Sequence, residues 1–175
     1  MMILATDVHY LSEVEARAAA VVFEHWDDPA PVAMYADRAT GFGPYIPGRF
    51  YERELPCLLP MLRWLSSAHD VDTIVVDGYV DLGTQAGLGR HVANALAEDN
   101  LTPAIVGVAK TQFEGAPAEA VLRGESTTPL WVTASGLPNT EAGNHVRAMY
   151  GRFRMPTLLL LVDHIARGHV VPSST

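Results

Sequence analysis

The sequence predicts an α/β domain in which helices pack on both faces of a mixed β-sheet. Three observations support this. Three segments of β character open the chain, strand-like and helix-like segments then alternate, and two helical segments close it. A meander followed by strand–helix units combines antiparallel and parallel strand pairs, whose apolar faces helices must cover. With 175 residues, 49% of them apolar, we expect a single domain spanning residues 1–175.

The opening segments are predicted as strands over Met2–Thr6, Ala18–Glu24 and Val32–Arg38. The first is a short apolar run, and the second precedes a turn signal of two aspartates and a proline. Gly41–Gly48 (GFGPYIPG) should be a loop, because glycine and proline interrupt it too often for a helix or a strand.

The next segment, Phe50–Ser67, has a helical period. Its leucines recur three or four residues apart, which is typical of an amphipathic helix. Pro56 fits the first turn of this helix, whereas Pro60 is expected to kink it.

The remaining elements are assigned from composition and period. Runs rich in β-branched residues predict buried strands, and longer periodic runs predict helices. The expected strands are Thr73–Val76, Ala104–Val108 and Leu130–Thr133, and the expected helices are Leu88–Glu98, Asn139–Tyr150 and Pro156–Arg167.

The charge balance argues against a general nucleic-acid binder with a basic face, since the net charge is −8 and the pI is near 5.2. A nuclease that binds divalent metal nevertheless needs clustered carboxylates. Lys110 is the only lysine among the twelve basic residues.

The setting is expected to be cytoplasmic, without a membrane partner. Cys57 is the only cysteine, so the chain cannot form an internal disulfide. The longest aliphatic run, Leu158–Val162, is too short to cross a bilayer.

Four acidic residues occupy informative positions. Asp7 ends or interrupts the first strand, Glu54 lies near the start of the first helix, Asp77 ends a buried strand, and Asp163 sits within an aliphatic helix. Each has a structural alternative as a cap, a turn residue or a solvated charge. Together they resemble the order of carboxylates in ribonuclease H-like nucleases. Oxygen ligands of this kind suit Mg²⁺ or Mn²⁺.

Several motifs resemble those of the endonuclease V family. The segment PYIPGRFYERELPCLL, from Pro44 to Leu59, is similar to the family signature in which PYIPG precedes an arginine–glutamate pair and a proline. TIVVDG, PAIVGVAK and FRMPTLLLLVD follow in the family's order, and ATDVHY resembles its first strand. The resemblance covers nearly the whole chain, from about Asp7 to about Arg167, and implies a ribonuclease H-like fold.

The resemblance also implies roles for individual residues in a metal-dependent nuclease. Asp7, Glu54 and Asp77 would be metal ligands, and Asp163 a ligand or a partner of one. Lys110 would neutralise charge near the scissile phosphate. All five would then belong to the catalytic machinery, with Mg²⁺ as cofactor and Mn²⁺ as an alternative.

The substrate implied by the resemblance is DNA or RNA containing inosine. Pro44, Tyr45, Ile46 and Pro47 would form a wedge inserted at the lesion, and Gly78 would lie beside the substrate. A rigid loop exposing an aromatic ring is independently a plausible stacking device, although Tyr45 folded back on the core is the structural alternative.

Two stretches depart from the family pattern. Gly83-Thr84-Gln85 stands where a His-Pro-Arg segment is usual, and Ser135-Gly136-Leu137 replaces a Gly-His-Arg. Three hypotheses therefore remain: an endonuclease cutting on the 3′ side of an inosine-type lesion to leave 3′-hydroxyl and 5′-phosphate ends, a weakly cleaving nucleic-acid-binding homologue, and a ribonuclease H-like hydrolase with another substrate such as structured RNA.

Overall fold

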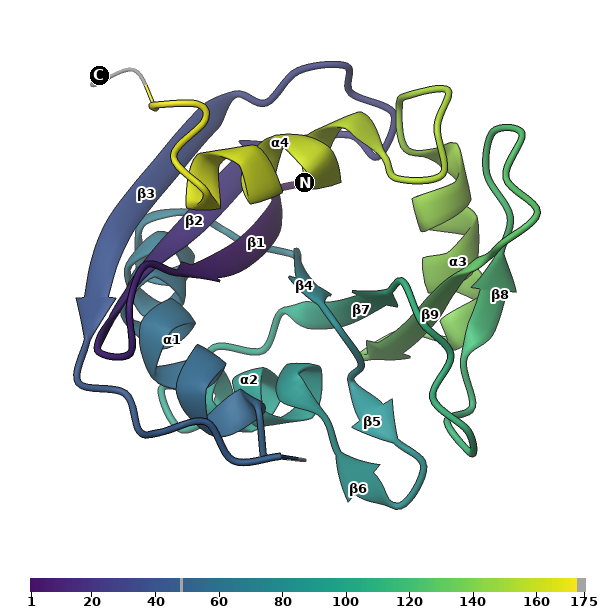
Figure 1. Ribbon diagram of the computed structural model, residues 1–175. Coiled ribbons are helices and arrows are strands. Elements are labelled where there is room, and N and C mark those ends of the chain that lie inside the picture. The colour runs from purple at the N-terminus through teal and green to yellow at the C-terminus, as the bar shows by residue number, and fades with distance from the viewer. Residues whose placement is uncertain (48, 173–175) are drawn as a thin grey trace.

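The computed structural model describes residues 1–47 and 49–172, and over these residues a seven-stranded mixed sheet forms the centre of the molecule (Figure 1). The strand order is β3-β2-β1-β4-β7-β9-β8, and a two-stranded hairpin, β5-β6, stands apart from it. The strands are β1 (Ile3–Tyr10), β2 (Glu15–Phe23), β3 (Ala33–Thr40), β4 (Thr73–Asp77), β5 (Asp81–Leu82), β6 (Gln85–Ala86), β7 (Ala104–Ala109), β8 (Glu119–Val121) and β9 (Leu130–Ser135).

The three central strands run in parallel, while their neighbours on both sides are antiparallel. Ile3 pairs with Thr73 and Ala5 with Val75, so the same register sets Asp7 level with Asp77. Asp77 in turn pairs with Val108 on β7. Parallel strands present their carboxyl ends at one edge, where sites in α/β sheets gather.

Helices cover both faces of the sheet, as predicted. The chain forms α1 (Tyr51–Ala68), α2 (Leu88–Ala97), α3 (Asn139–Ala148) and α4 (Thr157–Ala166). Alternation along the strands divides the core: Leu4 packs with the apolar side chains of α1 and α2, whereas Ile3 and Ala5 pack with those of α3 and α4. Among the described residues no helix has the length and apolarity needed to span a membrane.

The structure differs from the sequence prediction at several element boundaries. The first strand continues to Tyr10, because β2 pairs with it as far as Tyr10–Ala16, so Asp7 lies within the strand and not at its end. Helix α1 begins at Tyr51 and ends at Ala68 with Pro56 and Pro60 inside it, and the expected kink at Pro60 stays a prediction. The short strands β5, β6 and β8 were not predicted, since two or three residues carry no readable period.

The predicted loop before α1 is confirmed over residues 41–47, which form no helix or strand. Gly48, its last predicted residue, lies outside the described residues. The two C-terminal helices are slightly shorter than predicted, and α3 ends at Ala148 because Met149 takes up an extended ψ of 142°.

Candidate active site

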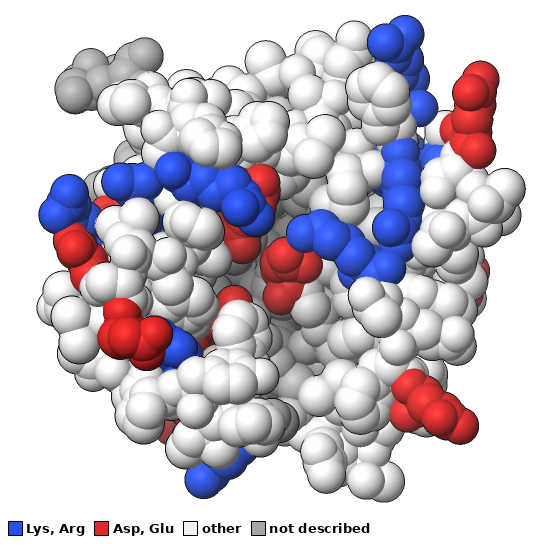
Figure 2. All heavy atoms as spheres, in the orientation of Figure 1, with Lys and Arg blue, Asp and Glu red and all other residues white. Residues whose placement is uncertain are grey.

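The predicted carboxylates lie around the edge where β4 and β7 end. Asp7, Asp77 and Asp163 line one hollow, together with Lys110 and Arg167. Glu54, in the first turn of α1, lines a neighbouring hollow that Asp77 shares. Acidic side chains accordingly surround a depression at the centre of one face, with basic side chains on two sides of it (Figure 2).

Asp7 lies in surroundings that disfavour its ionised form. Its pKa is raised to about 7, first by burial, then by the charge of Asp77 and more weakly by that of Asp163. The backbone N–H of Val8, which donates to Asp7 at 2.8 Å, offsets part of this increase. Desolvation and like charge both disfavour the ionised form, so the metal-free site favours a proton on Asp7 near neutral pH.

Glu54 is buried, with 7% of the residue exposed. Burial, Asp77 and Asp7, in that order, raise its pKa well above the ordinary value. No described residue donates a hydrogen bond to its carboxylate, whereas buried carboxylates are normally paired, hydrogen-bonded or metal-bound.

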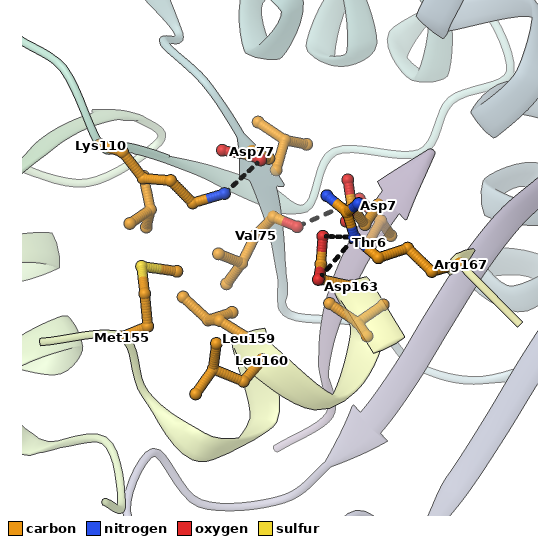
Figure 3. A pocket seen from close by; sticks show the side chains of 13 residues that line it. Thr6, Asp7, Val75, Asp77, Lys110, Met155, Leu159, Leu160, Asp163 and Arg167 are labelled. Atoms are coloured by element: carbon orange, nitrogen blue, oxygen red, sulfur yellow. Dashed lines mark hydrogen bonds and ion pairs between the residues drawn. The ribbon is translucent and has the colours of Figure 1, made fainter. Parts of the chain in front are cut away.

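Two cationic side chains meet the cluster from opposite sides (Figure 3). The Lys110 ammonium lies 3.2 Å from an oxygen of Asp77, and Nε of Arg167 lies 2.9 Å from both carboxylate oxygens of Asp163. The alternative pairing of Lys110 with Glu114 is not formed in the described part of the chain. Arg167 was missed as a site residue, although its spacing of four from Asp163 on a helix is a readable signal.

The four carboxylates are chemically suited to bind a divalent cation, but their side chains do not yet converge on one point. Across residues 1–47 and 49–172, no three His, Cys, Asp or Glu side chains are spaced to hold a metal as they stand. Asp77 and Asp163 nevertheless help raise the pKa of Asp7, and Asp77 and Asp7 that of Glu54. The side chains of Asp77 and Asp163 pair with Lys110 and Arg167. Their convergence on a shared cation therefore remains a prediction.

The loop before α1 exposes the predicted wedge residue. Tyr45 is 57% exposed, so the alternative of a ring folded into the core is wrong. Its ring packs edge-on against Phe50, with centroids 6.4 Å apart, and Phe50 lines the same hollow as Glu54. The neighbouring Pro44, Ile46 and Pro47 are also exposed.

The hollow beside Glu54 measures about 560 Å³, within the range of small-molecule sites. Gly78 lines it with a φ of +128°, a conformation that side-chain-bearing residues rarely adopt. His91, from α2, stacks on Tyr51 with ring centroids 3.7 Å apart. Sequence reasoning missed His91, because a single histidine on a helix gives no signal of a pocket.

The sequence profile of the endonuclease V family matches residues 1–160 of this chain. The chain belongs to the endonuclease V family. The match ends three residues before Asp163. A search among curated proteins finds no match.

Solved structures show the same fold. Human endonuclease V superposes with a TM-score of 0.73 at 22% identity, over 96% of this chain and 83% of that one. A Ciona intestinalis endonuclease V, solved with a 24mer DNA containing an inosine followed by a ribo-adenosine, superposes with a TM-score of 0.78 at 18% identity, over 96% of this chain and 84% of that one. Aquifex aeolicus Argonaute superposes with a TM-score of 0.62 at 13% identity, over 98% of this chain and 29% of that one. The predicted ribonuclease H-like fold is confirmed.

The two stretches that depart from the endonuclease V pattern are joined through one arginine. Arg90, on α2, holds both carboxylate oxygens of Asp81 at 3.0 and 2.6 Å and donates to the Ser135 hydroxyl at 2.8 Å. Asp81 precedes the altered Gly83-Thr84-Gln85, and Ser135 begins the other altered stretch. Arg90, whose charge is paired with Asp81, thus links the two segments that depart from the endonuclease V pattern.

Proposed function

We propose that this protein is a divalent-metal-dependent endonuclease that nicks nucleic acid on the 3′ side of a deaminated purine of the inosine type. The observation that carries the proposal is the meeting of Asp7, Asp77 and Lys110 at one edge of the sheet in a chain of the endonuclease V family. Water would bond to phosphorus as the bond to the 3′ oxygen breaks. The products would be a 3′-hydroxyl and a 5′-phosphate.

Asp7, Glu54 and Asp77 would hold Mg²⁺ or Mn²⁺, with Asp163 as a further ligand or as a partner that orients one. Carboxylate oxygens are the donors these ions prefer. When bound, such ions activate water and neutralise charge at the phosphorus centre. The raised pKa values of Asp7 and Glu54, caused first by burial and then by neighbouring carboxylates, support this assignment, because a bound cation would stabilise the ionised forms.

Lys110 would direct its ammonium at the scissile phosphate. It follows β7 directly and is half-exposed, so a small rotation from Asp77 would bring it to a phosphate oxygen. A compact ammonium meets phosphate as a point charge.

The lesion base would enter the hollow lined by Gly78, Tyr79 and His91, while Tyr45 and its neighbours hold the opened strand apart. An enzyme acting on a base in a duplex must take that base out of the stack, and an aromatic wedge compensates for the lost stacking. The exposure of Tyr45 supports this role.

A second candidate is a homologue of altered substrate preference or weakened cleavage that still binds nucleic acid. The replacement of both basic stretches by Gly83-Thr84-Gln85 and Ser135-Gly136-Leu137 favours it. Retention of the acidic residues and Lys110 favours catalysis, because a binder of phosphate gains nothing from clustered carboxylates.

The test is incubation of the protein with labelled DNA and RNA oligonucleotides containing inosine or adenosine at one position, with Mg²⁺, Mn²⁺ or a chelator. The expected result is one cut, on the 3′ side of inosine, that depends on metal. Binding without cutting would favour the second candidate. Cutting that ignores inosine would refute lesion specificity while retaining the nuclease.

A further inference from the structure

Residues 150–154, which connect α3 to α4 and are called the 150–154 loop below, lie directly beside Lys110. The guanidinium of Arg154 donates to the backbone carbonyl of Lys110, and also to that of Pro129 at 2.7 Å. The position of this loop is therefore tied to that of the lysine at the candidate active site.

A buried arginine holds the loop in shape. Arg123 is 5% exposed and has no carboxylate partner among the described residues. Its guanidinium instead donates to backbone carbonyls of the loop, including Phe153 at 2.9 Å and Gly151 and Arg154 at 3.2 Å, and to Met149 just before it. A charged donor satisfied by several carbonyls fixes their positions, because moving any of them would leave buried charge without a partner.

The 150–154 loop exposes a basic and an aromatic side chain to solvent. Phe153 is 59% exposed, and the Arg152 guanidinium lies over its ring, 4.9 Å from the centroid. Arg152 makes no ion pair in the described part of the chain. The recess around these two side chains is also lined by Glu125, Ser126 and Arg154.

Basic residues are scarce in this chain, yet they gather here. Of the twelve, four either belong to the 150–154 loop or contact it: Lys110, Arg123, Arg152 and Arg154. Arg123 is buried, so the basic side chains that solvent can reach here are Lys110, Arg152 and Arg154, which with Phe153 form a basic and aromatic ridge beside the acidic centre. In a protein of net charge −8, such a ridge favours binding of a polyanion.

From these contacts we infer that the 150–154 loop binds the single strand that continues on the 3′ side of the cut, with Phe153 stacking on an unpaired base and Arg152 meeting a phosphate. This inference rests on the proposed function for its direction. Asp77 is shared by the lesion hollow and by the hollow that contains Lys110. If the lesion base occupies its hollow, the cut on its 3′ side falls beside Lys110. The strand beyond the cut then continues toward the 150–154 loop. Exposed aromatic rings flanked by arginine are the usual means of holding single strands without regard to sequence.

The experiment measures the affinity of single-stranded oligonucleotides by fluorescence anisotropy in Ca²⁺, with a gel to verify that they remain uncut. Strands carry inosine or adenosine and either stop just past the cut position or continue for about ten nucleotides, a typical site size for single-strand grooves. Wild-type protein is compared with Arg152→Gln/Phe153→Leu. Arg63→Gln serves as the control, since Arg63 is exposed and pairs with Asp99 beyond the end of α2, at the opposite edge of the sheet.

We expect wild type and Arg63→Gln to bind the extended strand more tightly than the short one. The loop variant should lose about fivefold or more on the extended strand, the effect of one lost stack, and little on the short strand. Its slope of log affinity against log salt should fall by about 0.7, corresponding to one phosphate contact on a single strand. A merely structural loop would leave that slope unchanged, and melting curves verify that the variant is folded.

The outcomes separate this inference from the proposed function. Equal affinities of wild type and loop variant for the extended strand, with inosine still preferred, would overturn the inference alone. Loss on the extended strand without any preference for inosine would support the loop and refute lesion recognition. Absence of binding by wild-type protein would overturn both.

Discussion

The ammonium nitrogen of Lys110 lies 3.2 Å from a carboxylate oxygen of Asp77, across two adjacent parallel strands, and the two side chains are 48% and 45% exposed. An ion pair as open to water as this one stabilises the fold by about 1 kcal/mol or less. Its two members are therefore open to functional tests that leave the fold intact.

Lys110→Ala should slow metal-dependent cleavage by about a hundredfold, the usual cost of losing one group that stabilises transition-state charge. Metal affinity should change far less, because the lysine acts on the phosphoryl group. Single-turnover rates and calorimetric metal titration provide the two measurements. Cleavage by the variant at the wild-type rate would contradict a catalytic role for Lys110.

Asp77→Asn should abolish Mg²⁺-dependent cleavage without unfolding the protein. The substitution removes a proposed ligand and also a charge that raises the pKa of both Asp7 and Glu54, so the melting temperature of the metal-free protein should hold or rise. Asp99→Asn, at the far edge of the sheet, is the matched control and should cleave normally. Full activity of Asp77→Asn would remove Asp77 from the mechanism.

Metal binding should tighten as pH rises through neutrality. The pKa of Asp7 is raised to about 7, so below that pH a proton competes with the cation for its carboxylate. We expect Mn²⁺ affinity at about pH 8 to exceed that at about pH 6 by roughly tenfold, one proton per pH unit below the pKa. An affinity independent of pH over this range would contradict the assignment of Asp7 as a ligand.

The metal-free fold should show the opposite trend. Because the folded-state pKa of Asp7 exceeds its ordinary value of 3.8, its contribution to stability is fully present below that value and is lost as pH rises through about 7. Glu54, whose pKa is raised in the same direction, adds to this effect. In chelator, the melting temperature should therefore fall between about pH 5 and pH 8, and Asp7→Asn should flatten that dependence.

Tyr45→Ala should impair cleavage of duplex substrates more than that of single strands. A wedge matters only where stacked neighbours must be separated, and an unpaired strand needs no such step. Stability should change little, since the ring is mostly exposed. The measurement is the ratio of cleavage rates for duplex and single-stranded inosine oligonucleotides, and an unchanged ratio would eliminate the wedge role.

The sequence alone was sufficient for the alternation of strands and helices, the Gly/Pro-rich loop that exposes Tyr45, and the order of the acidic residues. These features are local. A period of two or 3.6 residues, a proline, or a carboxylate after an apolar run can be recognised within a short window. The position of Lys110 just past a buried strand could be predicted from the sequence for the same reason.

Only the tertiary structure decided which charges meet. Lys110 reaches Asp77 from 33 residues away, and Arg90 joins Asp81 to Ser135, 54 residues apart in the chain. The raised pKa of Asp7 likewise depends on burial and on neighbours from β4 and α4. Burial and through-space charge act over a few ångströms irrespective of sequence separation, so no local pattern encodes them until strand register and helix packing bring these groups together.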